Sequence, residues 1–231
     1  PPISQAEAIG VVNGVAGARD VVVSAAGSLP GDLHKLWRAS DPKGYHVEYG
    51  YSCMGYEIAG GLGVKMADPD REVFVLVGDG SYLMMSSEIA TSIQEGYKLN
   101  IVLLDNHGFG SIGGLSQSLG SGGFGTEYRY RNPATGLLDG DRLPVDFVAN
   151  AASLGAHAAR ATTRDELRRA LEEARRQPRT SVVVIEVDPE ARLPAYGSWW
   201  NVPVAEVSAM PSVRQARAEY EESARNERSF L

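Results

Sequence analysis

Short apolar runs that alternate with helix-like segments are the feature that most restricts how this chain can fold. Strands are expected at residues 21–23, 72–77, 100–105, 156–160 and 181–187. Runs that are apolar throughout, rather than at every second residue, indicate a parallel sheet covered by helices on both faces. We therefore expect an α/β protein with three layers, α/β/α, and a mostly parallel sheet of about six strands.

Helices are expected around these strands, and a C-terminal tail is expected after them. The helical ranges are 4–17, 30–38, 54–67, 83–95, 145–154, 163–176 and 211–224. Ser4 with Glu7 three residues later is the signature of a capping box. Residues 107–141 are polar and glycine-rich without periodicity, which is typical of a functional or mobile loop. We expect a main domain over residues 1–195 and a tail with a short helix over 196–231.

Composition excludes several functional classes. The net charge of the 231 residues is −7, which argues against nonspecific binding to nucleic acid. No apolar run approaches the roughly 18 residues of a membrane helix, and no signal peptide is visible. Cys53 is the single cysteine, which fits a reducing compartment. We expect a cytoplasmic protein that binds neither nucleic acid nor a membrane.

Polar residues follow two consecutive strands of the expected sheet. Gly78-Asp79-Gly80-Ser81 ends one strand, and Asn106 ends the next. If these strands are neighbours, Asp79 and Asn106 reach the edge where open α/β sheets bind ligands. Carboxylate and amide oxygens suit Mg²⁺ or Ca²⁺, and backbone N–H groups at the start of the following helix favour phosphate. The alternative is that both segments are ordinary tight turns.

These residues resemble the metal and diphosphate motif of thiamine diphosphate enzymes. The resemblance implies that Asp79, Asn106 and the backbone carbonyl of Gly108 bind Mg²⁺, with Gly78, Gly80 and Ser81 close to the cofactor. Asp105 is a departure, because many relatives have Asn there. Alternation along a strand points Asp105 away from Asn106, so it is not counted as a ligand.

A second segment, Cys53-Met54-Gly55-Tyr56, resembles the Thr-Met-Gly-Phe/Tyr sequence of the acetohydroxyacid synthase group. That resemblance implies that the Met54 side chain supports the bent cofactor and that the Ser52 carbonyl binds its aminopyrimidine. Gly27, Ser28 and Leu29 fall where the family makes further diphosphate contacts. A core methionine and an ordinary strand-to-helix turn are the alternatives.

Residues 25–37, 45–57 and 198–203 narrow the resemblance to the ring-opening hydrolases of inositol catabolism. It implies hydrolytic C–C cleavage of a cyclic 1,2-diketone, a small-molecule substrate, with thiamine diphosphate and Mg²⁺ as cofactors. His46 and His107 are the acid–base candidates near the site, with Glu48 a weaker one. Alternatively, His46 and Glu48 only structure a loop, and His107 caps a helix.

The glutamate that activates the cofactor in this superfamily comes from a pyrimidine-binding domain, usually of a neighbouring subunit. No Glu in this chain matches that motif, and the resemblance covers only the C-terminal third of such an enzyme. The chain also begins at Pro1 without Met. We expect the pyrophosphate-binding part of a homo-oligomeric enzyme, which needs a pyrimidine-binding domain from the parent enzyme or a second subunit for turnover.

Other functions remain open at this stage. The cofactor motifs are shared with acetolactate synthases and 2-oxoacid decarboxylases, so they do not discriminate between these reactions. A noncatalytic binding or assembly domain is an alternative of another class, and Trp199 and Trp200 in the tail would suit it. A dinucleotide-binding domain is the weakest alternative, because no Gly-x-Gly-x-x-Gly follows the first strand.

Overall fold

The computed structural model describes residues 2–194, 197 and 199–228. The chain divides into two compact units, Pro1–Phe109 with Pro144–Arg192 and Gly110–Leu143 with Leu193–Leu231. Ser198, and the domain boundary expected between residues 195 and 196, lie outside the described residues.

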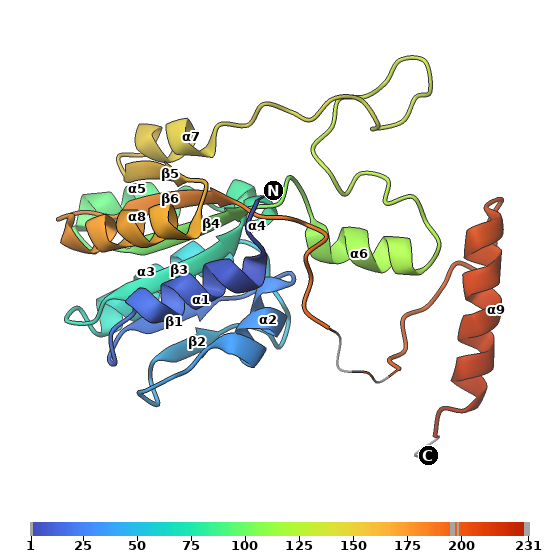
Figure 1. Ribbon diagram of the computed structural model, residues 1–231, viewed down its shortest axis with the longest axis horizontal. Helices are drawn as coiled ribbons and strands as arrows, with labels where there is room; N and C mark the ends of the chain where they lie inside the picture. The colour runs from blue at the N-terminus through green and yellow to red at the C-terminus, as the bar shows by residue number, and fades with distance from the viewer. Residues whose placement is uncertain (1, 195–196, 198, 229–231) are drawn as a thin grey trace. The chain divides into compact units, whose positions relative to one another are not determined.

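The first unit is built on a six-stranded parallel sheet in the order β2-β1-β3-β4-β6-β5 (Figure 1). Its strands are β1 Val21–Ser24, β2 Tyr45–Val47, β3 Val73–Gly78, β4 Asn100–Asp105, β5 His157–Ala161 and β6 Ser181–Glu186. The four central strands are almost entirely buried, which explains their unbroken apolar sequences. The expected parallel sheet of about six strands is confirmed.

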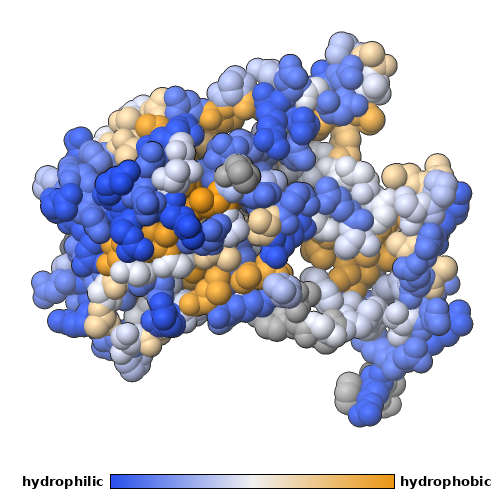
Figure 2. All heavy atoms as spheres, viewed as in Figure 1, coloured by the Kyte–Doolittle hydropathy of each residue, from blue (hydrophilic) through white to orange (hydrophobic). Residues whose placement is uncertain are grey.

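Helices cover both faces of this sheet, as the three-layer expectation requires. In the first unit they are α1 Gln5–Val15, α2 Leu29–Leu36, α3 Tyr56–Ala67, α4 Asp79–Met84, α5 Glu88–Glu95, α7 Phe147–Ser153 and α8 Arg164–Arg176. One apolar cluster joins the sheet to α1, α2 and α8, and another joins its opposite face to α3, α5 and α7. On the visible face of this unit, hydrophilic side chains surround patches of apolar residues (Figure 2). None of the helices in the described residues is long and apolar enough to cross a membrane.

The second unit contains α6 Gly110–Ser118 and α9 Pro211–Arg225. The sequence predicted α9 but treated residues 107–141 as irregular, so α6 corrects that expectation. Glycines conceal this helix in the sequence, yet Gly113 lies so close to Thr126 that an added Cβ would be 3.1 Å from its Oγ1 atom. Packing against a neighbouring segment thus outweighs the low helix propensity of glycine.

Two further expectations were wrong in detail. Strand β2 was missed, because it has only three half-buried residues at the edge of the sheet. The helix expected over 83–95 is two helices, α4 and α5, separated at Met85, whose backbone is not helical (φ −147°, ψ 53°). Met85 packs instead against Gly55, where an added Cβ would lie 2.7 Å from the Met85 Cγ atom.

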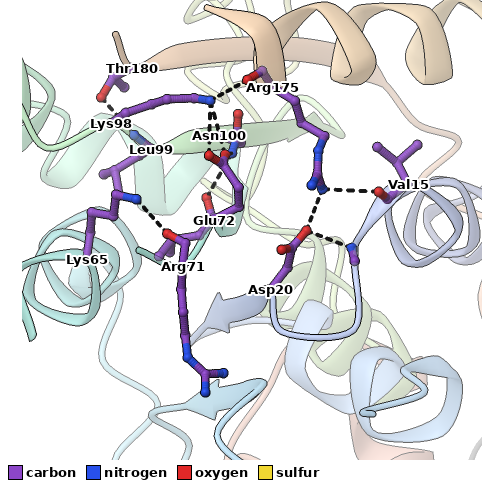
Figure 3. A network of polar contacts seen from close by, with 12 residues as sticks. Val15, Asp20, Lys65, Arg71, Glu72, Lys98, Leu99, Asn100, Arg175 and Thr180 are labelled. Carbon is purple, nitrogen blue, oxygen red and sulfur yellow. Dashed lines mark hydrogen bonds and ion pairs between the residues drawn. The ribbon is translucent and has the colours of Figure 1, made fainter. Parts of the chain in front are cut away.

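A polar network fixes the amino-terminal ends of the strands, opposite the edge where Asp79 lies (Figure 3). The Glu72 carboxylate accepts from Asn100 Nδ2 at 2.6 Å and pairs with Lys98 at 3.1 Å. Lys98 also donates to the Arg175 carbonyl at 2.6 Å, which links β4 to the end of α8. Burial by itself raises the pKa of Glu72, but these bonds outweigh it and hold that pKa below its usual value.

Helix α3 packs closely on β3 because it presents glycine to the sheet. A Cβ added at Gly61 would lie 2.4 Å from Val75 Cγ2, whereas one added at Gly63 would meet nothing within 4 Å. Gly61 is buried and Gly63 is exposed. Glycine at position 61 therefore serves the packing of the helix on the sheet.

We predict opposite effects from the same substitution at these two glycines. Gly61→Ala should lower the free energy of unfolding by about 1–3 kcal/mol, because the added methyl overpacks the helix–sheet interface. Gly63→Ala should raise it by up to about 1 kcal/mol through helix propensity. Urea denaturation of the two variants measures both values, and a destabilised Gly63→Ala or a neutral Gly61→Ala would contradict the packing.

Candidate functional site

The register of β3 and β4 brings the polar strand ends together. Gly78 pairs with Leu104 across the two strands, so Asp79 and Asp105, one residue further along each, leave the sheet side by side. Asn106 follows immediately. The expectation that Asp79 and Asn106 lie at one edge of the sheet requires β3 and β4 to be neighbours. The structure shows that these two strands are paired.

Asp79 is completely buried at this edge, and both of its carboxyl oxygens accept backbone hydrogen bonds. Gly80 N–H donates to Oδ1 at 3.0 Å, and Gly108 N–H donates to Oδ2 at 2.8 Å. Burial, and after it the negative charge of Asp105, raise the pKa of Asp79 to about 8. A buried carboxyl beside a second one needs either a proton or a cation to be stable.

Asn106 supplies an oxygen without a partner. Its side-chain Oδ1 is buried and accepts no hydrogen bond within the part of the chain that the structure describes. An unpaired buried carbonyl oxygen is costly, and in native proteins it calls for an explanation such as a bound ion. Together with Asp79 it offers the hard oxygen donors that Mg²⁺ prefers. The two residues therefore fit a magnesium site, although no cluster of three or more His, Cys, Asp or Glu side chains suited to a metal occurs among the described residues.

Asp105 was expected to point away from Asn106, and the structure places it next to Asp79. Its carboxyl lies beside that of Asp79, and its Oδ1 accepts the N–H of His107 at 3.1 Å. His107 has a left-handed backbone with φ 64°, which is strained for a residue other than glycine.

The two candidate histidines have different surroundings. His107 lies between carboxylates, with Nε2 2.8 Å from Glu186 Oε1 and Nδ1 3.4 Å from Asp105 Oδ1. His46 lies on β2, where its Nε2 shares a 2.7 Å hydrogen bond with the Tyr56 hydroxyl and the two rings stack. Each histidine is therefore held in one orientation by a polar partner.

The segment that carries Ser52 and Met54 is held by Glu48. Its carboxylate accepts from Tyr51 N–H at 3.1 Å and from Cys53 N–H at 2.9 Å, one on each side of Ser52. Ser52 has a left-handed backbone with φ 52°. Among the described residues, Ser52 and His107 are the two non-glycine residues with positive φ. The bonds from Cys53 and Tyr51 lower the pKa of Glu48. Glu48 therefore fixes the loop, which makes it a weak candidate for proton transfer.

Residues of the β1–α2 turn offer the site mainly their backbone. Leu29 is buried in the apolar core, and the Ser28 hydroxyl donates to Gln5 at 3.2 Å. Gly27 has φ 84°, which favours glycine at this position. Contacts of this turn with a ligand would therefore come from N–H groups rather than from side chains.

Glu57 is a buried residue of this region to which the sequence assigned no role. Glu57 is 1% exposed, and it accepts hydrogen bonds from Ala26, Gly55 and Ser81. The Ser81 hydroxyl is consequently occupied, because it donates to Glu57 at 2.6 Å and accepts from Gly55 N–H at 2.7 Å. A charged residue near the start of the otherwise apolar, glycine-rich helix α3 was the available signal.

A parallel sheet with polar residues at the ends of two adjacent strands is an arrangement typical of ligand-binding α/β domains, and the comparison with protein families agrees. Residues 25–187 match the family model described as "Thiamine pyrophosphate enzyme, C-terminal TPP binding domain". The chain belongs to this family, whose name uses the older term for thiamine diphosphate.

Individual proteins with similar sequences include hydrolases. The chain is 48% identical over 214 residues to a 3D-(3,5/4)-trihydroxycyclohexane-1,2-dione hydrolase of Bacillus cereus, and 47% identical to the enzyme of that name from Bacillus thuringiensis. Each alignment covers 93% of this chain and 33% of the relative, so the chain spans about a third of the length of these curated relatives.

A solved structure shares the fold. It is the thiamine diphosphate-dependent 4-hydroxybenzoylformate decarboxylase of Rhodococcus jostii, with a TM-score of 0.68 and 21% sequence identity over 81% of this chain and 33% of that one. At this level of identity the likeness concerns the fold alone.

We predict that the metal-free chain loses stability as the pH rises from about 4 to about 8. The native state holds a proton on Asp79 up to a pKa of about 8, whereas an unfolded Asp releases it near its ordinary pKa of 3.8. The unfolded state therefore binds fewer protons across this interval, and the free energy of unfolding falls by up to about 1.4 kcal/mol per pH unit.

Urea denaturation in EDTA at several pH values measures this slope. Asp105→Asn should flatten it, because the like charge that helps to raise the pKa of Asp79 is removed. Identical slopes for the wild type and Asp105→Asn would contradict the interaction between the two carboxyls.

Proposed function

We propose that this chain binds thiamine diphosphate through Mg²⁺ at the carboxyl ends of β3 and β4. We further propose that it forms the diphosphate-binding part of a hydrolase that opens a cyclic 1,2-diketone in inositol catabolism. The observation that carries the first proposal is that the buried Asp79 carboxyl and the buried, unpartnered Oδ1 of Asn106 follow the ends of two adjacent strands. The identity of 48% to a trihydroxycyclohexanedione hydrolase supports the second.

In this proposal three groups of the chain bind the metal: the Asp79 carboxylate, the Asn106 Oδ1 and the backbone carbonyl of Gly108. Mg²⁺ takes six oxygens, so phosphate oxygens and water complete its shell. Gly78 is open to the cofactor, because a Cβ there would meet nothing within 4 Å. Gly80 and Ser81 contribute backbone rather than side-chain groups, since the Ser81 hydroxyl is already bonded to Glu57.

The remaining cofactor contacts come from two turns. The backbone of Gly27, Ser28 and Leu29 faces the diphosphate, while the Ser52 carbonyl and the Met54 side chain orient the rest of the cofactor. When bound, thiamine diphosphate supplies the electron sink for cleavage of a carbon–carbon bond. The residues of this chain hold it in place and position protons around it.

We assign proton transfer to His107 and His46. The His107 ring lies between two carboxylates, which hold its orientation. His46 can exchange a proton through its hydrogen bond with the Tyr56 hydroxyl. We propose that the activating glutamate comes from a pyrimidine-binding domain of the parent enzyme or a second subunit, in a cytoplasmic homo-oligomer.

Isothermal titration calorimetry tests the cofactor site. The chain should bind thiamine diphosphate in the presence of Mg²⁺ and lose at least about tenfold in affinity in EDTA. Asp79→Ala and Asn106→Ala should each reduce the Mg²⁺-dependent affinity by a similar factor or more, because each removes one oxygen ligand. Asp70→Ala, at an exposed loop before β3, is the matched control and should bind as the wild type does. Equal binding by Asp79→Ala would overturn the assignment.

A turnover assay tests the need for a further domain. Supplied with thiamine diphosphate, Mg²⁺ and the trihydroxycyclohexanedione, this chain by itself should open the ring no faster than buffer does. Addition of a pyrimidine-binding domain should restore turnover. Rapid ring opening by the chain alone would contradict the requirement, and turnover of pyruvate in preference to the dione would favour an acetolactate synthase-like reaction.

A further inference from the structure

We propose that Glu57 is a positioning residue that holds the three cofactor-facing segments of the first unit in one fixed arrangement. The proposal rests on the function proposed above and adds a residue that lies outside the set of metal and cofactor ligands. Its basis is a single buried carboxylate that is hydrogen-bonded to three segments far apart in the sequence.

The contacts divide between the two carboxylate oxygens. Oε1 accepts from Ala26 N–H at 3.2 Å. Oε2 accepts from Gly55 N–H at 3.1 Å and from the Ser81 hydroxyl at 2.6 Å. The Ser81 hydroxyl in turn accepts from Gly55 N–H at 2.7 Å, so Glu57, Ser81 and Gly55 form a closed triangle of hydrogen bonds.

Every partner of Glu57 is a donor, which suits a group that can only accept. Glu57 also lies in the first turn of α3, where the positive end of the helix dipole favours an acidic side chain. All four residues of the group are buried, so water does not compete for these bonds. The carboxylate is thus placed where its charge is compensated by oriented N–H and O–H groups.

Each segment bound by Glu57 carries part of the proposed site. Ala26 directly precedes Gly27 of the β1–α2 turn, Gly55 directly follows Met54, and Ser81 lies two residues after Asp79. A ligand that contacts all three segments binds more tightly when they are already aligned, because less conformational entropy is lost on binding. Glu57 provides this alignment through hydrogen bonds buried beneath the turns.

Two substitutions distinguish the bond of Glu57 to Ala26 from its bonds to Gly55 and Ser81. In Glu57→Gln the amide oxygen can replace Oε2, which accepts two bonds, and the NH₂ group then faces the Ala26 N–H, a donor against a donor. Ser81→Ala leaves the bond to Ala26 intact but removes the hydroxyl from the triangle at Gly55. Glu166→Gln is the matched control, because the Glu166 carboxylate also accepts from a backbone N–H and a hydroxyl, both of Thr162.

Hydrogen exchange of individual amides, followed by NMR on the chain without cofactor, gives the direct readout. Glu57→Gln should speed exchange of the Ala26 amide by about tenfold or more, with a smaller change at Gly55. Ser81→Ala should show the reverse order. Glu166→Gln should leave both amides at the wild-type rate. Unchanged exchange rates at Ala26 and Gly55 would contradict the proposal that Glu57 holds these segments. A uniform increase in exchange throughout the first unit would contradict it as well.

Calorimetry with thiamine diphosphate and Mg²⁺ then tests whether the hydrogen bonds of Glu57 contribute to cofactor affinity. Glu57→Gln should weaken binding by about tenfold, while Glu166→Gln binds as the wild type does. Wild-type affinity in Glu57→Gln would overturn the positioning role and leave the proposed function standing. Failure of the wild-type chain to bind the cofactor would instead overturn the proposed function, whatever the exchange rates show.

Discussion

The pairing of Gly78 with Leu104 between β3 and β4 is the constraint on which the candidate site depends. Because the side-chain period of a strand is two, a slip of one residue would turn Asp79 and Asp105 to opposite sides of the sheet. The buried, unbroken apolar sequences of both strands, and the polar network at their amino-terminal ends, fix this register. Ordinary packing in the middle of the sheet thus determines which polar groups meet at its edge.

Buried polar groups are compensated differently at the two ends of the sheet. At the amino-terminal ends, Glu72 is paired with Lys98 and Asn100, so its charge is balanced within the chain. At the carboxyl ends, Asp79 and Asp105 face each other and the Asn106 oxygen has no partner. The charge of Glu72 is therefore paired within the chain at one edge, whereas the two carboxyls at the other edge are stabilised by a proton or a cation. This contrast in charge supports the binding site that we propose at the second edge.

Much of the fold could be predicted from the sequence, because the apolar strands and the Ser4 capping box have strong local signals, and the structure bears both out. Features set by tertiary packing could not. Helix α6 is concealed by its glycines, and the break at Met85 arises from packing on Gly55. That Asp79 and Asn106 follow adjacent strands could be predicted from strand order. The hydrogen bonds of Glu57 to three separate segments depend instead on tertiary geometry. The predicted site residues remain predictions until a ligand is bound.

A crystal structure of the chain with thiamine diphosphate and Mn²⁺ in place of Mg²⁺ tests the central claim most directly. Manganese accepts the same oxygen ligands and gives an anomalous signal that locates it without assumptions about the site. We expect one anomalous peak within bonding distance of Asp79, Asn106 Oδ1 and the Gly108 carbonyl, with the diphosphate on its open side. A diphosphate bound elsewhere, or a peak away from Asp79 and Asn106, would contradict it.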